Sequence, residues 1–132
     1  MKVQPILRLK NISKAFGSFQ AVKDINLEIF EGEFFTIVGP SGSGKSTLIR
    51  LLVGMDDLTS GEIYLRGNRI DRTPANLRPT CMVFQSLALF PHMSVGQNIE
   101  FPLKLKKMAP NDRKQKSLEL LDLLRLPKSF YE

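Results

Sequence analysis

A short run in the first half of the chain has the residue types and the spacing that can hold a phosphate group. It reads Gly39-Pro40-Ser41-Gly42-Ser43-Gly44-Lys45-Ser46-Thr47, which fits the pattern of Gly, four residues, Gly, Lys and Ser or Thr. Gly42 and Gly44 lack a Cβ, so their backbone can adopt positive φ values and bring N–H groups around a phosphate. Lys45 is expected to reach the β- and γ-phosphate oxygens, and the Ser46 hydroxyl is expected to ligate Mg²⁺ beside them. The motif predicts a nucleoside triphosphate site.

The residues on either side of this loop predict the strand and the helix that must position it. Residues 33–38 are an apolar, β-branched and aromatic run, which is typical of a buried parallel strand. Residues 47–53 have helical spacing and stop at Gly54, a residue type that commonly ends helices. The start of that helix would add unpaired N–H groups and the positive end of its dipole to the phosphate site. We therefore expect strand, loop and helix here and not a flexible Gly/Ser linker.

Other segments predict further strands. Period-two alternation over residues 6–10, 21–30 and 61–70 predicts half-buried antiparallel strands, which implies a second sheet. Residues 81–84 are short, apolar and β-prone, so they are expected to form a second parallel strand. The single cysteine, Cys81, lies in that run and is expected to be a buried core thiol.

Two helices are predicted in the last third of the chain. Ser94 is expected to cap a helix over residues 95–106, which Pro102 should end or kink. Asn111 is expected to cap a second helix, which Pro127 interrupts.

Composition places the chain among globular domains. It has 132 residues, 42% hydrophobic and 24% charged, which fits one domain with a buried core. Its apolar stretches are shorter than a membrane span needs, and it starts without an apolar signal core, so we expect a soluble cytoplasmic protein. The net charge of +6 raises nucleic-acid binding as a possibility. Its lysines and arginines cluster in predicted helices without interleaved aromatics, so we expect a solvated face and no nucleic-acid partner.

Four further stretches resemble one known family. They are residues 9–17, 21–33, 60–63 and 82–95. Together with the phosphate loop they cover most of the chain, which resembles the N-terminal half of an ABC transporter ATP-binding subunit. The resemblance implies an α/β P-loop NTPase fold of the ABC ATPase type. Such a fold has parallel core strands around the phosphate loop, an N-terminal antiparallel β-subdomain and the start of a helical subdomain, and it would be incomplete here.

The resemblance also implies roles for single residues. Phe16 would stack on adenine, and Val22 would line the nucleotide site. Gln85 would help to position Mg²⁺ and the attacking water, and the loop beyond it would relay the nucleotide state to a membrane partner. Leu87 differs from the aromatic often found there in importers of polyamines, ferric iron, sulfate and sugars, the group that this stretch resembles most. His92, the only histidine, does not match the family's catalytic histidine and is assigned to loop structure or partner contact.

ATP and Mg²⁺ are the cofactors that the resemblance implies. Lys45 and Gln85 are the catalytic candidates, and Ser46 and Gln85 are the candidate metal ligands. Residues 1–93 would form the nucleotide-binding core with the β-subdomain, and residues 94–132 would begin the helical subdomain. The implied partners are the permease subunits of an importer and a second nucleotide-binding domain in a homodimer. The protein would then lie in the cytoplasm, on the inner face of the plasma membrane through the permease.

Three other parts of the family's catalytic machinery are not found in the sequence. These are an apolar strand ending in Asp-Glu, the Leu-Ser-Gly-Gly-Gln signature and a later histidine; residues 118–122 follow a helical pattern instead. We therefore expect a fragment that binds MgATP weakly without hydrolysing it alone. Apolar faces at residues 34–35 and 81–83 should be partly uncovered and favour aggregation. The alternatives are a non-catalytic nucleotide-binding or regulatory fragment and, with slight support from the charge, an ABC-type ATPase acting on DNA.

Overall fold

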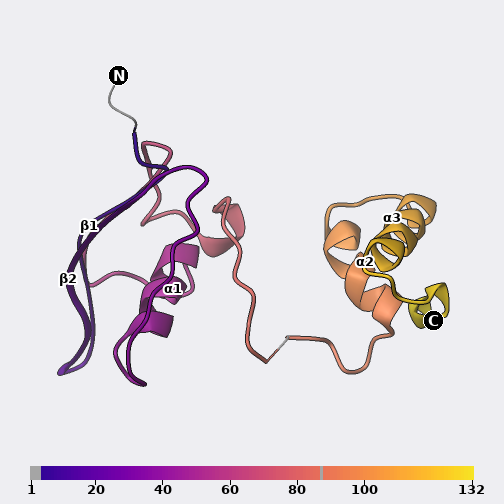
Figure 1. Cartoon of the computed structure of the whole chain (residues 1–132), viewed down its shortest axis with the longest axis horizontal. Helices are drawn as coiled ribbons and strands as arrows, with labels where there is room; N and C mark the ends of the chain where they lie inside the picture. The colour runs from indigo at the N-terminus through magenta and orange to yellow at the C-terminus, as the bar shows by residue number, and fades with distance from the viewer. Residues whose placement is uncertain (1–3, 87) are drawn as a thin grey trace. The chain divides into compact units, whose positions relative to one another are not determined.

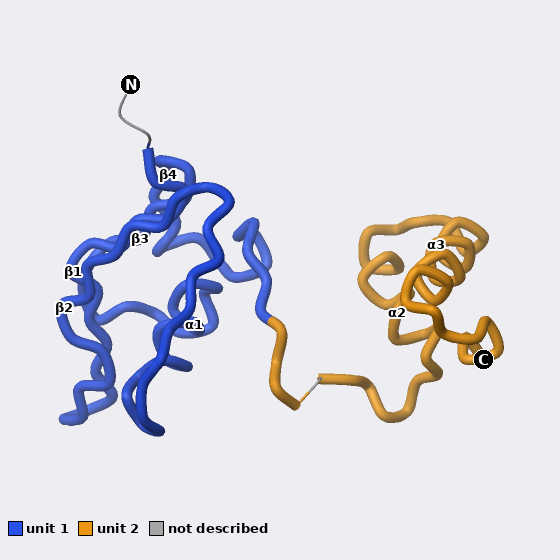
Figure 2. Tube along the Cα trace, in the orientation of Figure 1, with its two compact units in different colours: residues 1–82 blue, residues 83–132 orange. Residues whose placement is uncertain are grey.

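The computed structural model describes residues 4–86 and 88–132, so Leu87 lies outside the described residues. The chain divides into two compact units, residues 1–82 and residues 83–132 (Figures 1 and 2). Each unit is described by itself below. Among the described residues, no helix is both long enough and apolar enough to cross a membrane.

The first unit contains an antiparallel sheet of four strands in the order β2-β1-β3-β4. The strands are β1 (Leu7–Phe16), β2 (Phe19–Ile29), β3 (Ser60–Leu65) and β4 (Asn68–Arg69). Leu9 of β1 stands opposite both Leu27 of β2 and Ile63 of β3, so apolar side chains line up across one face of the sheet. The predicted antiparallel strands over residues 6–10 and 21–30 are confirmed as parts of β1 and β2, whereas the predicted strand over residues 61–70 is two shorter strands, β3 and β4, joined by a turn at residues 66–67.

Helix α1 (Lys45–Val53) packs on the apolar face of this sheet (Figure 1). Its Leu48 and Leu51 are buried in one cluster with Leu9, Ile12, Val22 and Ile63 of the sheet and with Ile70, which follows β4. The helix ends at Gly54 as predicted, because this glycine adopts a φ of 82° and its N–H returns to the carbonyls of the last turn. The sheet therefore fixes the helix that begins at the phosphate loop.

The two predicted parallel strands are not formed. Residues 33–38 and residues 81–84 are not strands and pair with none among the described residues. A strand assignment needs a neighbour that supplies a hydrogen-bonded ladder, and local apolar composition cannot provide one. Phe34 is 98% exposed and Val83 is 90% exposed, which confirms the expectation of uncovered apolar side chains. The prediction of a buried Cys81 is wrong for the same reason, and its thiol is exposed.

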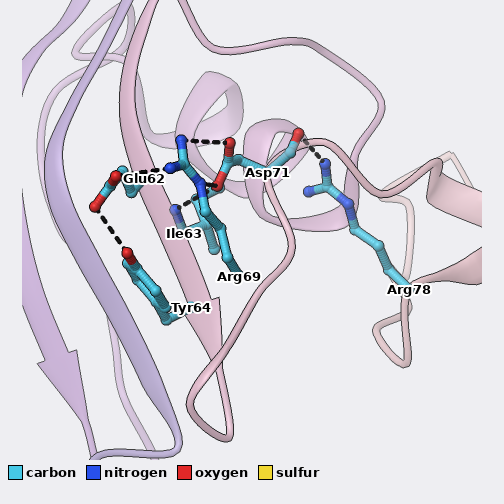
Figure 3. A network of polar contacts seen from close by, with 6 residues as sticks. All are labelled: Glu62, Ile63, Tyr64, Arg69, Asp71 and Arg78. Carbon is cyan, nitrogen blue, oxygen red and sulfur yellow. Dashed lines mark hydrogen bonds and ion pairs between the residues drawn. The ribbon is translucent and has the colours of Figure 1, made fainter.

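A polar network fixes the chain after the sheet against α1 (Figure 3). Asp71 accepts a hydrogen bond from Arg69 Nε at 2.8 Å, while its own carbonyl accepts one from Arg78 Nη2 at 3.0 Å. Arg78 follows a short 3-10 helix, η1 (Ala75–Leu77), and is buried. Its guanidinium also donates to the last turn of α1, so one side chain joins the helix to the loop beyond β4.

The second unit contains α2 (Val95–Leu105), α3 (Pro110–Leu123) and a 3-10 helix, η2 (Lys128–Tyr131). Ser94 caps α2 as predicted: its Oγ accepts from the N–H of Gln97, and the Gln97 side chain accepts from the N–H of Ser94.

Two predictions on these helices need correction. Of the two predicted effects of Pro102, an end or a kink of the helix, the end is wrong: α2 continues to Leu105, because the missing N–H costs one hydrogen bond close to the helix end. Asn111 does not cap α3: the N-cap is Ala109, and Pro110 is the first helical residue. Proline has the right φ and needs no hydrogen-bond acceptor there, so the helix begins one residue before the expected cap.

A cluster of side chains holds the helices of the second unit together. The Tyr131 hydroxyl donates to the carboxylate of Glu100, which also accepts from Arg113 Nε at 3.2 Å. Gly96 in the first turn of α2 leaves room for the tyrosine, because a Cβ there would lie 2.6 Å from Tyr131 Cδ2. These contacts join α2, α3 and η2.

Candidate functional site

The phosphate loop, residues 39–44, leads directly into α1. Gly42 and Gly44 have φ values of 79° and 87°, so the predicted need for glycine at both positions is confirmed. The helix begins at Lys45, two residues before the stretch over residues 47–53 that was predicted to be helical. Gly44 is the N-cap and no side chain caps the helix, so the first N–H groups of α1 are available to an anion.

The backbone of strand β2 lies so close to Gly44 of this loop that there is no room for a side chain between them. A Cβ at Gly44 would overlap the carbonyl oxygen of Ala21 and would lie 3.4 Å from the Val22 side chain. Glycine is therefore required at Gly44 by the space next to β2 as well as by its φ.

The Lys45 ammonium folds back onto its own loop. Its Nζ donates to the carbonyl oxygens of Gly39 at 2.8 Å and Pro40 at 2.6 Å, and to Ser43 Oγ at 3.1 Å. These three acceptors match the three donors of an ammonium group. A phosphate that binds Lys45 has to replace some of these contacts with its own oxygens.

A pocket of about 340 Å³ opens beside the loop. Val22, Ile37 and Leu48 provide apolar lining, while Gly39, Ser43 and Lys45 provide the polar lining. A larger pocket of about 720 Å³ lies elsewhere, on the sheet around Arg8 and Tyr64. We favour the smaller pocket as the functional site because it combines backbone donors, a helix N-terminus and an ammonium group.

The remaining loop residues lie where a phosphate chain could reach them. Ser41, Ser43 and Ser46 are exposed, and Thr47 is half-buried in the first turn of α1. Val22 is 6% exposed and lines the pocket.

Phe16, the expected base platform, is the last residue of β1 and is 49% exposed. The tip of the β1–β2 hairpin and the phosphate loop lie at the same, lower end of the first unit in Figure 1. The Lys14 ammonium lies 4.8 Å from the centroid of the Phe16 ring. Lys14 was not among the residues predicted from the sequence, although residues two apart on a strand tend to share a face and could have suggested the pair.

Gln85 and His92 belong to the second unit, and both are exposed. The phosphate loop belongs to the first unit, and each unit is described by itself, so the role of Gln85 stays a prediction. The His92 ring packs edge-on near Phe90, with ring centroids 6.1 Å apart, which fits its assignment to loop structure.

Comparisons with known proteins agree on one family. A model described as ABC transporter matches residues 22–131. The spermidine/putrescine import ATP-binding protein PotA of Thermotoga maritima is 49% identical over 89% of this chain and 32% of its own length. The PotA protein of Nitrosomonas eutropha is 48% identical over 95% of this chain and 35% of its own length. The chain thus spans about a third of these curated relatives.

Solved structures share the fold. A dimeric ATP-binding cassette in a post-hydrolysis state, bound to ADP and Pi, has a TM-score of 0.78 and 34% identity, covering 95% of this chain and 60% of that one. A dimeric bacterial ABC transporter cassette has a TM-score of 0.76 and 33% identity, covering 96% of this chain and 60% of that one. The predicted P-loop ATPase fold class is confirmed.

Proposed function

This chain belongs to the ABC transporter family, and we propose that it forms the ATP-binding part of an importer subunit that couples MgATP to solute uptake. The observation that carries the proposal is the phosphate loop, where two glycines with positive φ, a helix N-terminus and the Lys45 ammonium converge. The relatives are named as spermidine/putrescine import proteins, which supports import and a polyamine as the solute. The importer activity and the solute are proposals, because the chain spans about a third of those relatives.

The residues at the loop fit a nucleotide phosphate chain with its Mg²⁺. The α1 N-terminus has no side-chain cap, and Gly44 sits where any Cβ would overlap Ala21, so backbone N–H groups can approach a ligand closely. The Ser46 hydroxyl is exposed in the first turn of α1, where a hydroxyl can ligate a hard cation. The donor set is therefore the one that a magnesium-bound triphosphate requires.

We assign a role to each polar group. Lys45 exchanges its loop carbonyls for phosphate oxygens and neutralises their charge, which lowers the barrier to phosphoryl transfer. Ser46 would hold the metal from the first turn of α1, and the resemblance implies that Gln85 would be a second ligand and would help to position the attacking water. Bound Mg²⁺ supplies further charge neutralisation.

Apolar groups would contact the base of the nucleotide and line the pocket beside the phosphate loop. Phe16 offers an exposed aromatic ring at the end of β1, and Val22 lines the pocket beside the loop. Stacking on an aromatic ring favours a planar base and excludes water from it.

Membership of the family suggests which proteins the subunit binds and where in the cell it lies. We propose that the subunit binds permease subunits and a second copy of itself, with support from solved relatives that are dimers. It would lie on the cytoplasmic face of the plasma membrane through the permease. Residues 1–93 would form the nucleotide-binding core with the β-subdomain, and residues 94–132 would begin the helical subdomain.

Calorimetric titration of the chain with MgATP tests the proposal. Lys45→Ala should abolish measurable binding, because it removes the side-chain ammonium that is held at the loop. Lys104→Ala is the matched control, since it removes an exposed charge on α2 and should bind as the wild type does. Equal binding by wild type and Lys45→Ala would overturn the proposal.

A further inference from the structure

One face of the Phe16 ring is covered by a lysine that also reaches the chain after α1. The Lys14 Nζ lies 4.8 Å from the ring centroid and donates to the carbonyl oxygen of Asp57 at 2.7 Å. Phe16 nevertheless remains 49% exposed, so part of the ring is open to a ligand. The ammonium therefore fixes the ring without burying it.

Two hydrogen bonds with Thr59, one to its side chain and one from its backbone, hold the end of β1 at the same place. The N–H of Ala15 donates to Thr59 Oγ1 at 2.9 Å, and the N–H of Thr59 donates to the carbonyl oxygen of Ser13 at 3.0 Å. The residues immediately before Phe16 are thus tied to the loop over residues 57–59. These contacts limit the directions in which the ring can move.

The same loop is tied to the helix that carries the phosphate site. Arg50 in α1 donates from Nε to Asp56 at 2.7 Å, next to the Asp57 carbonyl that holds Lys14. A series of polar contacts thereby runs from α1 through residues 56–59 to the ring of Phe16. The series thus ties Phe16 to α1, the helix whose first turn follows the phosphate loop.

We propose that Lys14 is a positioning residue for the nucleotide base, with Thr59 as its support. The inference rests on the proposed function, in which Phe16 stacks on the base. With one face covered by the ammonium, the base stacks on the opposite face of a ring that is already ordered. Less conformational freedom is then lost on binding, which increases affinity. Lys14 contributes nothing to phosphate binding.

The test compares ATP with inorganic tripolyphosphate, both with Mg²⁺, by calorimetric titration of the full chain. Lys14→Met should weaken ATP binding by about three- to tenfold and leave tripolyphosphate binding within about twofold. Lys14→Arg keeps a cation over the ring and should restore most of the ATP affinity. Lys10→Met is the matched control on the same strand, because Lys10 lies 4.9 Å from the Tyr64 ring centroid, and it should change neither affinity.

Substitutions at Thr59 test the positioning of Phe16 independently of Lys14. Thr59→Val removes the hydroxyl that accepts from Ala15 and should weaken ATP binding selectively, whereas Thr59→Ser should not. ATP binding that is unchanged by Lys14→Met, or weakened equally with tripolyphosphate, would overturn the inference while leaving the proposed function intact. Wild-type chain that binds neither ligand would overturn the proposed function, and this inference with it.

Discussion

Arg78 Nη1 donates to the carbonyl oxygen of Leu51 at 2.8 Å, at the end of α1 opposite the phosphate loop. Arg78 is 7% exposed and its Nε also donates to the Thr73 carbonyl at 2.7 Å. Burial lowers the pKa of Arg78, and the charges of Asp71 and Asp57 oppose that shift. A cation at the negative end of a helix dipole is favourable, so the buried guanidinium stabilises the helix that holds the phosphate site.

Arg78→Met should therefore destabilise the first unit. The substitution leaves the carbonyls at the end of α1 without their side-chain donor, and we expect a loss of about 2–3 kcal/mol in the free energy of unfolding. Urea denaturation followed by circular dichroism measures it. Arg66→Met is the control, because Arg66 pairs with Glu31 on the exposed surface and should cost less than about 1 kcal/mol. Equal stability of the two variants would show that the buried contacts contribute little.

Gly44→Ala should reduce MgATP affinity by more than tenfold, an order-of-magnitude expectation for a residue at which both φ and space forbid a side chain. The added Cβ would overlap the Ala21 carbonyl and push the loop away from β2. Gly67→Ala separates the effect of backbone strain from the effect of limited space. Gly67 has a φ of 78°, and a Cβ added there would have no atom of the described residues within 4 Å. This variant should lose some stability and keep nucleotide binding. Calorimetric titration with MgATP measures both variants, and loss of binding by Gly67→Ala would contradict the local explanation.

Sequence alone predicted the features that depend on a few neighbouring residues. The positive φ of Gly42 and Gly44 follows from the phosphate-loop pattern, and the cap at Ser94 follows from a suitable residue type before a helical run. The end of α1 at Gly54 likewise follows from the type of one residue, because glycine readily adopts the positive φ that ends a helix.

Features that depend on distant partners were not predicted. Residues 33–38 have the composition of a strand, yet a strand forms only where a neighbour pairs with it. The contact of Lys14 with Asp57 spans 43 residues, and that of Arg78 with Leu51 spans 27. No short pattern encodes either contact, because the folded sheet and α1 bring these residues together.

Ser43→Ala should increase MgATP affinity by roughly threefold, because it removes one acceptor that competes with phosphate for the Lys45 ammonium. The backbone N–H of residue 43 is kept, so the phosphate loses no main-chain donor. Ser129→Ala is the control, because it removes an exposed hydroxyl from η2, outside the phosphate loop, and it should bind as wild type does. Titration calorimetry measures the change. Weaker binding by Ser43→Ala would mean that this hydroxyl contacts the nucleotide directly.

The second unit should lose stability in acid through Glu100. The hydrogen bond from Tyr131, with a second one from Arg113, holds the pKa of Glu100 below its ordinary value of 4.5 despite partial burial. A lowered pKa in the folded state means that the stabilisation is complete above that ordinary value and is lost as the pH falls through the lowered pKa. Glu100→Gln cannot ionise, so its thermal midpoint should lie below that of wild type near neutral pH, and the difference should vanish in acid. Glu119→Gln, exposed on α3, should follow the wild type throughout, with midpoints read from circular dichroism. A Glu100→Gln difference that persists unchanged in acid would show that the carboxylate's charge contributes nothing to this cluster.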